Sequence, residues 1–308
     1  MTGSPTAQAC LLYFDDERPA AERLAAASGL ALRPVQRHCF PDGELKLTLP
    51  VDGAGQLPVR AVLLRSLYQP NDKLVELLLA ARAARALGVR HLTLVAPYLA
   101  YMRQDIAFHP GEAVSQRIVG PFLASLFDAV VTVDPHLHRV ATLPEAVPAA
   151  QAVVVSGAPL LADWIAEHVE KPLIVGPDEE SEQWAGSIAS RIGAPHVVLR
   201  KTRHGDRSVD IEVPDLSVWR DRTPVLVDDI ASSGRTLAIA AHKLAEQGMR
   251  KPECVVVHAL FAEDAWTLLT PLFARITSTD TVPHPSNRIG LASLIAGALS
   301  SGQTDPRT

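Results

Sequence analysis

Residues 224–236 read Pro-Val-Leu-Val-Asp-Asp-Ile-Ala-Ser-Ser-Gly-Arg-Thr, the pattern of a buried strand, a polar loop and the start of a helix. Successive backbone amides at a helix start, with hydroxyl groups beside them, form a pocket for a phosphate. Because Asp228 and Asp229 repel a phosphate, we expect them to accept hydrogen bonds from sugar hydroxyls on the same ligand. The alternative is an ordinary capped helix, but tandem Asp at the exit of a strand, where α/β proteins bind ligands, favours a site. The loop residues expected to hold the ligand are Ser232, Ser233, Gly234, Arg235 and Thr236.

Similar apolar runs alternate with helical patterns along the whole chain. This alternation predicts an α/β fold with mainly parallel sheets, whose strands are buried on both faces and flanked by helices. The expected strands are Cys10–Tyr13, Ala61–Arg65, His91–Ala96, Ala129–Val133, Leu173–Val175, Val197–Leu199, Val225–Val227, Cys254–His258 and Arg275–Thr277. The expected helices are Asn71–Leu87, Ser181–Ile192 with Ser181 as its cap, and Thr236–Gln247 before Gly248. A hairpin around Asp42-Gly43 is expected over Phe40–Leu49.

The length and an internal similarity predict two domains. The chain has 308 residues, about twice a common domain size. The Pro- and Ala-rich stretch Leu143–Pro159 is the expected boundary. On either side lies a similar order of strand, helix and strand, with Asp134 and Asp178 each soon after a strand. We therefore expect related α/β domains at residues 1–150 and 151–286, with a helix over 287–300 joining the first.

Composition argues against several other classes of protein. The 29 Lys and Arg against 34 Asp and Glu give a net charge of −5, which is unsuited to neutralising a nucleic-acid backbone. The longest uncharged run, Ala146–Ala162, contains two prolines and would not span a bilayer. The three cysteines lie far apart, in no disulfide or zinc pattern. Since the N-terminus also lacks the features of a signal peptide, we expect a cytoplasmic protein that binds neither nucleic acid nor membranes.

The 224–236 loop resembles the phosphoribosyl-binding loop of type I phosphoribosyltransferases and ribose-phosphate pyrophosphokinases, which implies ribose 5-phosphate or its pyrophosphorylated product as ligand. Residues 96–105, Ala-Pro-Tyr-Leu-Ala-Tyr-Met-Arg-Gln-Asp, resemble the nucleotide-binding signature of the pyrophosphokinases, which phosphoribosyltransferases lack. There Arg103 offers a planar fork to phosphate or a purine, and Gln104 and Asp105 can pair with base or ribose. The alternative is a surface ion pair between Arg103 and Asp105.

Two more segments resemble parts of the same family. Phe40-Pro-Asp-Gly-Glu44 is similar to its adenine-contacting hairpin, with Phe40 stacking on the base and Asp42 and Glu44 reading its amino edge. An edge hairpin with solvated acids is the alternative. Residues 133–138, Val-Asp-Pro-His-Leu-His, resemble a strand end with a metal-associated histidine, here His136. Because Mg²⁺ prefers oxygen ligands, a hydrogen bond from His136 to nucleotide phosphate is the alternative there.

The remaining resemblances concern metal and charge. Asp178 occupies the family's second metal-binding place, and Lys201 and Arg203 match cations of a loop that closes over the triphosphate. On its own, such a basic run is usually a solvated loop. Glu180 stands where many relatives have glycine, and this version resembles an archaeal-like branch of the family.

Together the resemblances imply two tandem type I phosphoribosyltransferase-like domains, the first binding ATP and the second ribose 5-phosphate. The implied activity is an Mg²⁺-dependent ribose-phosphate diphosphokinase, which makes 5-phosphoribosyl 1-pyrophosphate and AMP and assembles as a homo-oligomer. Lys201 and Arg203 are the implied catalytic residues, and His136 and Asp178 the implied metal ligands. A phosphoribosyltransferase, which needs a nucleobase and no ATP, is the first alternative. A non-catalytic regulatory relative of the synthetase is the second.

Overall fold

The computed structural model describes residues 9–204 and 208–301, without the side chains of Glu180 and of residues 201–212. The chain divides into two compact units. Unit 1 comprises Met1–Val155 and Ala292–Thr308, and unit 2 comprises Ser156–Leu291. The C-terminal helix therefore belongs to the unit in which the chain begins.

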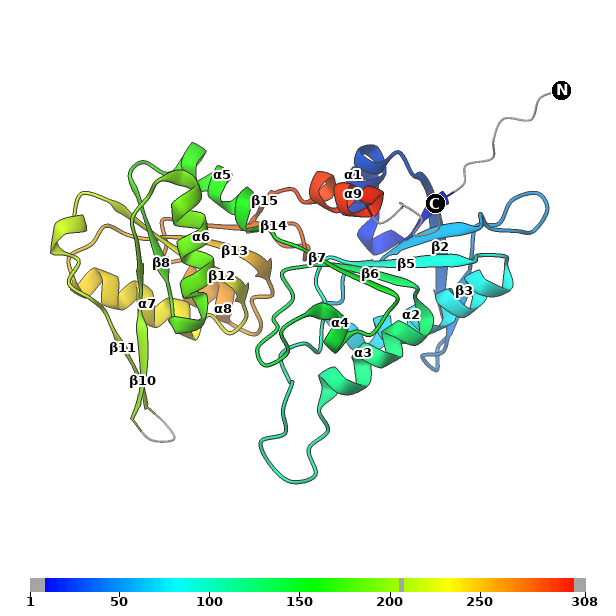
Figure 1. The fold of residues 1–308 in the computed structure, drawn as a ribbon, viewed down its shortest axis with the longest axis horizontal. Helices are drawn as coiled ribbons and strands as arrows, with labels where there is room; N and C mark the ends of the chain where they lie inside the picture. Colours follow the sequence, from blue (N-terminus) through cyan, green and yellow to red (C-terminus); the bar gives the residue numbers. More distant parts are fainter. Residues whose placement is uncertain (1–8, 205–207, 302–308) are drawn as a thin grey trace. The chain divides into compact units, whose positions relative to one another are not determined.

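Unit 1 is built on a seven-stranded sheet in the order β3-β2-β1-β4-β5-β6-β7. All neighbouring strands in it are parallel except β2 and β3. Figure 1 shows α1 and α9 on one face of this sheet and α2, α3 and α4 on the other, which is why the central strands β5 and β6 are buried at nearly every position. The strands are β1 (Ala9–Phe14), β2 (Ala31–Cys39), β3 (Leu45–Thr48), β4 (Arg60–Leu64), β5 (His91–Ala96), β6 (Ala129–Val133) and β7 (Gln151–Val155), and the helices are α1 (Arg18–Ser28), α2 (Pro70–Ala86), α3 (Ser115–Leu126), α4 (Leu143–Ala146) and α9 (Ala292–Ser301).

Unit 2 is built on a six-stranded parallel sheet in the order β15-β14-β13-β12-β8-β9. In its core, apolar side chains of β8, β12 and β13 pack against those of α7 and α8. A separate antiparallel ribbon is formed by β10 and β11. The strands are β8 (Pro172–Gly176), β9 (His196–Val198), β10 (Arg200–His204), β11 (Ser208–Glu212), β12 (Thr223–Ala231), β13 (Glu253–Ala259), β14 (Arg275–Thr279) and β15 (Asn287–Ile289), and the helices are α5 (Ala158–His168), α6 (Glu182–Ile192), α7 (Arg235–Glu246) and α8 (Ala265–Leu269).

Both sheets reverse their strand order at the same topological position. In unit 1 the chain passes from β1 to β2 and then places β4 on the other side of β1, and in unit 2 it passes from β8 to β9 and then places β12 on the other side of β8. Open α/β sheets bind ligands outside the carboxyl ends of the strands at such a reversal. Each unit therefore has one such position, between β1 and β4 in unit 1 and between β8 and β12 in unit 2.

The equivalent order of the two sheets shows which residues of the two units correspond. Asp134 directly follows β6, whose counterpart in unit 2 is β14, so its topological equivalent is Asp280. Asp178 follows β8, whose counterpart is β1, and is equivalent to the start of Asp15–Glu17. Both residues follow a strand as expected, but they do not occupy equivalent places, because a local order of strand and helix does not reveal the place of a strand in its sheet.

Most of the expected secondary structure is confirmed. His91–Ala96 and Ala129–Val133 have the expected bounds, the other expected strands match within a few residues, and the hairpin after Cys39 is present. The stretch Leu143–Pro159 is more structured than a linker, since it contains α4 and β7, and the two units divide between Val155 and Ser156. The expected helix over 287–300 begins only at Ala292, because Asn287–Ile289 pairs with β14.

Candidate active site

In unit 2, the end of β12 is open on one side. Strand β8 pairs with β12 only as far as Leu226, whereas β12 continues to Ala231 along β13. Asp228 and Asp229 lie in this continuation, beyond the pairing with β8. Asp178 follows the end of β8 and begins the short 3-10 helix Glu179–Ser181. The sheet thus brings three acidic residues from separate parts of the sequence to one reversal point.

These acids interact strongly. The pKa of Asp228 lies well above its usual range because burial removes water from the carboxyl and because Asp229 and Asp178 add negative charge. The backbone amide of Asp229 donates to Asp228 Oδ1 at 3.0 Å, which offsets only part of this cost. Excess negative charge of this kind is relieved by a bound cation or by hydroxyl donors.

The donor set suits a magnesium ion held only partly by protein. Carboxylate oxygens are the ligands that Mg²⁺ prefers, and it commonly keeps water and substrate phosphate as its other ligands. Among the described residues, no three His, Cys, Asp or Glu side chains form a preformed metal centre. An ion beside Asp178 and Asp228 would therefore depend on further oxygen ligands from a substrate.

The polar loop after β12 has the form expected of a phosphate site. Gly234 precedes α7 with φ of 70°, and a Cβ added there would lie 2.7 Å from Leu269 Cδ1. Glycine is therefore required both by the left-handed backbone and by the close approach of α8. The first turn of α7 leaves backbone amides without intrahelical partners, as at any helix start, and Thr236 lies in that turn.

The segment after β13 holds this loop in place. The amides of Leu260 and Phe261 both donate to the carbonyl of Ala231, at 3.1 and 2.9 Å, and the amide of Ala262 donates to the carbonyl of Ser232 at 3.1 Å. Ser233 and Arg235 are exposed, whereas Ser232 and Thr236 are partly buried. The loop thus has an anchored backbone and accessible polar side chains.

In unit 1, the segments after β5 and β6 are joined by a buried carboxylate. Asp105, of which 4% is exposed, accepts the backbone amide of Arg139 at 3.0 Å and its Nη1 at 2.7 Å. Burial alone would raise the pKa of Asp105, but these hydrogen bonds and the charge of Arg139 hold it below its usual value. Asp105 therefore links the loop of Arg103 to the loop of His136.

The other expected nucleotide residues of this region differ in their surroundings. Arg103 is exposed. The Gln104 carboxamide binds its own segment, since its oxygen accepts the amide of Ser115 at the start of α3 and its nitrogen donates to the carbonyl of Ile106. His136 is partly buried, with its ring 5.7 Å from that of His138. Arg103 is thus an exposed cation that a phosphate can reach.

The remaining expected nucleotide-binding residues, Phe40, Asp42 and Glu44, lie on the hairpin between β2 and β3. The turn is closed by hydrogen bonds from the Phe40 amide to the Glu44 carbonyl and from the Gly43 amide to the Phe40 carbonyl, at 2.8 and 2.9 Å. The Asp42 carboxylate accepts the Glu44 amide at 3.1 Å. Phe40 is 39% exposed, which is unusual for so large an apolar ring and leaves a face for stacking.

Lys201 and Arg203 lie on β10, where they pair with Ile211 and Val209 of β11. Their side chains lie outside the described residues. Sequence reasoning missed Arg139 because its partner is 34 residues away and the two meet only through the adjacency of β5 and β6. It also missed Leu269, whose contact behind Gly234 depends on the position of α8.

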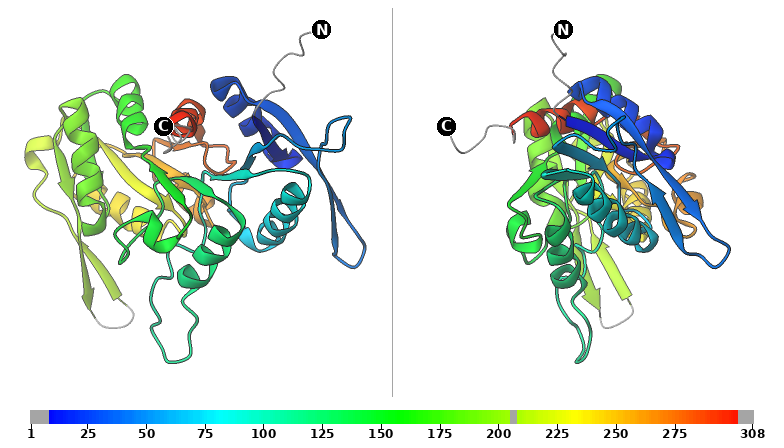
Figure 2. Two further views of the ribbon diagram at one scale, coloured as in Figure 1. Left: turned by 45° about the vertical axis from the view of Figure 1, so that its right-hand side comes forward. Right: turned by 90° about the vertical axis from the view of Figure 1, so that its right-hand side faces the viewer.

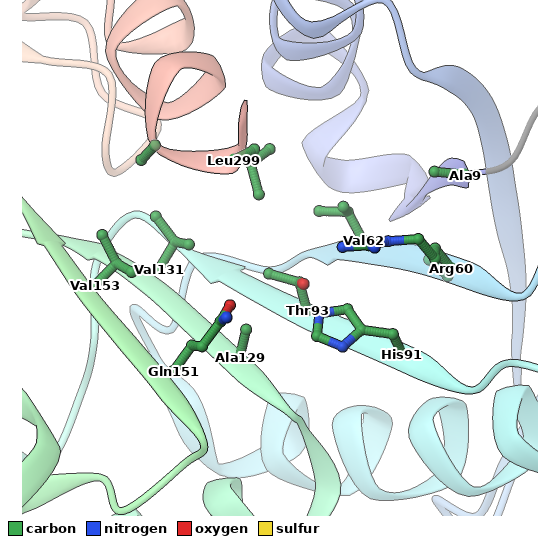
Figure 3. Close-up of a pocket in the computed structure, with 12 residues that line it drawn as sticks. Ala9, Arg60, Val62, His91, Thr93, Ala129, Val131, Gln151, Val153 and Leu299 are labelled. Carbon is green, nitrogen blue, oxygen red and sulfur yellow. The ribbon is translucent and has the colours of Figure 1, made fainter. Parts of the chain in front are cut away.

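The pocket in Figure 3 lies away from these groups. Arg60, His91 and Gln151 are the first residues of β4, β5 and β7, so the pocket lies at the amino ends of the strands. Ala298 and Leu299 of α9 line its other side. The expected nucleotide residues follow the carboxyl ends of β5 and β6 instead, so this pocket is separate from the candidate site.

Comparison with known proteins agrees with these features over most of the chain. Residues 9–126 match the family model of the N-terminal domain of ribose phosphate pyrophosphokinase, and residues 156–265 match that of the phosphoribosyl transferase domain. The ribose-phosphate pyrophosphokinase of Methanopyrus kandleri is 37% identical over 284 residues, covering 91% of this chain and 94% of that protein. That of Halobacterium salinarum is 33% identical over 295 residues, covering 94% of this chain and 100% of the relative.

A solved structure shows the same fold. Phosphoribosylpyrophosphate synthetase from Mycobacterium smegmatis has a TM-score of 0.82 at 23% sequence identity, covering 96% of this chain and 98% of that one. The expected two-domain α/β architecture is thereby confirmed. No helix within residues 9–204 and 208–301 has the length and apolar character needed to cross a membrane. Given the identity and coverage of its relatives, the chain belongs to the ribose-phosphate pyrophosphokinase family.

Proposed function

We propose that this protein transfers the pyrophosphoryl group of ATP to the 1-hydroxyl of ribose 5-phosphate, giving 5-phosphoribosyl 1-pyrophosphate and AMP. Relatives named ribose-phosphate pyrophosphokinase match it over nearly their whole length. The structural observation that carries the proposal is the reversal point of unit 2, where three acids adjoin an anchored phosphate loop. A sugar phosphate is the ligand that satisfies both halves of this site.

Ribose 5-phosphate is assigned to unit 2. Asp228 and Asp229 accept hydrogen bonds from the ribose hydroxyls, because ionised carboxylates are strong acceptors. The amides at the start of α7 hold the 5-phosphate, with Ser232, Ser233 and Thr236 adding hydroxyl donors. Gly234 allows the backbone to approach the phosphate, and the exposed Arg235 adds positive charge at the rim.

ATP is assigned to residues of unit 1. Phe40 stacks on the adenine, Asp42 and Glu44 accept from its amino edge, and Arg103 binds phosphate. The Gln104 carboxamide holds the same segment through its hydrogen bonds to Ser115 and Ile106. Asp105 acts by holding the Arg103 loop to the His136 loop through Arg139.

We assign Mg²⁺ as the cofactor. Asp178 would hold such an ion or its phosphate ligands in unit 2, and His136 would do so in unit 1. When bound, the ion neutralises charge on the pyrophosphoryl group and orients it. The proximity of Asp178 to Asp228 supports this assignment, since the charge of Asp178 contributes to the raised pKa of Asp228 and carboxylate oxygens are ligands that Mg²⁺ prefers. We further expect a cytoplasmic homo-oligomer.

Transfer is an in-line displacement at the β-phosphorus of ATP. The anomeric oxygen of ribose 5-phosphate forms a bond to this phosphorus, its proton is released to solvent, and the bond to the bridging oxygen of the α-phosphate breaks to release AMP. Positioning and charge neutralisation supply most of the catalysis in such phosphoryl transfers. Lys201 and Arg203 are assigned to stabilise the charge that spreads over the transferred group.

The test is product formation by the purified protein with ATP, ribose 5-phosphate and Mg²⁺. We expect AMP and phosphoribosyl pyrophosphate in equal amounts, and loss of both when ribose 5-phosphate is omitted. Lys201→Ala is expected to lower turnover far more than ribose 5-phosphate affinity. Use of a nucleobase without ATP would show a phosphoribosyltransferase, and absence of any product across phosphate and metal conditions would show a non-catalytic relative.

A further inference from the structure

The reversal point of unit 1 is occupied by the protein's own charges. Asp15–Glu17 follow β1 and Arg65 follows β4, so they stand where unit 2 has Asp178 and Asp228. Arg65, only 1% exposed, lies 2.8 Å through Nη1 from Asp16 Oδ2 and 3.5 Å from Glu17 Oε1. Here the acids already have an internal cation. Arg65 therefore supplies to these acids the positive charge that a bound cation would supply in unit 2.

The buried network extends outward through Glu76 of α2. The Glu76 side chain, 2% exposed, pairs through Oε2 with Arg65 Nη2 and through Oε1 with Arg37 Nη1. Arg37 Nη2 also lies 3.8 Å from Asp16 Oδ1. Arg37 belongs to β2 and is 38% exposed. Glu76 thus connects the buried Arg65 to the partly exposed Arg37 of β2.

Beyond Val35, β2 leaves the body of the sheet. Strand β1 pairs with β2 only from Ala31 to Val35, and Gln36–Cys39 pair only with β3. Figure 2 shows this ribbon, in blue, running past the neighbouring strands of unit 1. A two-stranded ribbon alone is marginally stable in water. Its direction therefore depends on side contacts, and the Arg37–Glu76 pair is such a contact on the free part of β2.

We propose that Arg37 is a positioning residue for the nucleotide: its ion pair with the buried Glu76 fixes the direction of the ribbon that carries Phe40, Asp42 and Glu44. The proposal rests on the proposed function, in which this ribbon contacts adenine. Phe40 lies three strand residues beyond Arg37, about 10 Å away at about 3.3 Å per residue, so a tilt of about 10° moves it by about 2 Å. Misplacement by about 1 Å can cost about 100-fold in rate.

Kinetics of Arg37→Gln test the proposal. We expect KM for ATP to rise at least about tenfold, while KM for ribose 5-phosphate stays within about twofold. The preference for ATP over GTP is expected to fall, because the hairpin no longer presents Asp42 and Glu44 to the base in one orientation. Arg37→Lys, which keeps the charge but loses the planar fork, should recover part of the ATP affinity.

A matched control is available on the same strand. Arg33 donates through Nη1 to the carbonyl of Pro50 at 2.9 Å and lies in the part of β2 that β1 supports. Arg33→Gln is expected to leave both KM values and the nucleotide preference unchanged. Hydrogen exchange adds a measurement that needs no activity: amides of Gln36–Cys39 should exchange faster in Arg37→Gln but not in Arg33→Gln.

The outcomes separate the two proposals. An inactive wild-type protein contradicts the proposed function. An active wild type with unchanged exchange and unchanged KM for ATP in Arg37→Gln overturns only the role of Arg37. Equal rises in both KM values, or the same effect in Arg33→Gln, would show a general structural defect and would also overturn it.

Discussion

Asp228 shows how one residue can serve binding at a cost to stability. Its pKa is raised by burial and by the charges of Asp229 and Asp178, so ionising this carboxyl costs more free energy in the folded protein than in the unfolded chain. Such a cost is expected at a binding site, where the ligand later relieves it. The raised pKa of Asp228, which points to a binding site, therefore also predicts how a variant with an uncharged side chain at this position behaves.

We predict that Asp228→Asn raises the melting temperature at pH 7 without ligands while it weakens sugar binding. KM for ribose 5-phosphate should rise about tenfold or more, because a hydrogen bond to a charged group contributes about 1.5–3 kcal/mol. Mg²⁺ should raise the melting temperature of the wild type more than that of the variant. Thermal melts and steady-state kinetics measure these effects. Asp221→Asn, which removes a solvent-exposed partner of Lys171, is the control. An unchanged KM or a lower melting temperature would contradict the assignment.

A second residue-level prediction concerns Arg139. Replacing its side chain leaves the buried Asp105 carboxylate with one hydrogen bond fewer and without the neighbouring positive charge, which weakens the link between the Arg103 and His136 loops. We expect Arg139→Ala to raise KM for ATP by about tenfold, as for a small displacement of a positioned group, with little change in KM for ribose 5-phosphate. Steady-state kinetics with each substrate varied in turn measure both values.

Arg191→Ala is a matched control for Arg139→Ala, because Arg191 also pairs with a carboxylate through its guanidinium but at the exposed Asp163 of unit 2. It should leave both KM values unchanged. Equal effects of the two substitutions on ATP would show that loss of a surface cation, and not the link between the loops, is responsible.

At the scale of elements, the reversal point of unit 1 predicts a pH dependence. Burial raises the pKa of Glu17 to about 7, although Arg65 and Lys73 oppose the shift. Between pH 4.5 and about 7 the folded state therefore holds this proton more firmly than the unfolded state, so stability falls as pH rises through that window. The pKa of Lys73 is lowered by burial to about 8, and its effect lies above this window.

We predict that Glu17→Gln flattens this fall. Urea unfolding at pH 5, 6 and 7 should show a wild-type free energy of unfolding that decreases by at most about 1.4 kcal/mol per pH unit from this group, and a smaller decrease in the variant. Glu22→Gln, at an exposed position of α1, should keep the wild-type slope. Identical slopes in wild type and Glu17→Gln would contradict the assignment.

The sequence predicts most accurately the strands that are buried on both faces. Strands β5 and β6 are buried on both faces, so their apolar runs mark both ends. Strand β2 is exposed at most positions and has no apolar run that distinguishes it from a loop. Strand β7 has a short apolar run but is partly exposed and lies within the Pro- and Ala-rich stretch that was expected to be a boundary. The short β15 is recognised only by its pairing with β14.

The candidate site divides in the same way. Residues 228–236 are contiguous, so the sequence alone shows that these acids, hydroxyls and glycine lie close together. They run from the end of β12 into the start of α7, as expected. Asp105 with Arg139, and Arg37 with Glu76, meet only because particular strands and helices are neighbours. Sequence patterns carry no information on such long-range partners without the sheet order.

At the scale of the whole molecule, two sheets of equivalent order have opposite chemistry at their reversal points. Unit 1 has Arg65 among acids at this position, whereas unit 2 has the acids Asp178, Asp228 and Asp229 there. In our proposal the first unit uses the position for a supporting network and the second uses it to bind a sugar phosphate. We therefore predict a single ribose 5-phosphate site per chain, in unit 2.

In the proposed reaction, the anomeric oxygen of ribose 5-phosphate attacks the β-phosphorus of ATP. Phosphorus NMR of a reaction mixture with ATP, ribose 5-phosphate and Mg²⁺ tests this attack directly, because it distinguishes a pyrophosphate on the sugar from a single phosphate. We predict that AMP and a 1-pyrophosphorylated ribose 5-phosphate increase together in equal amounts. Formation of ADP with a bisphosphorylated ribose, or cleavage of ATP without a change in the sugar, would contradict it.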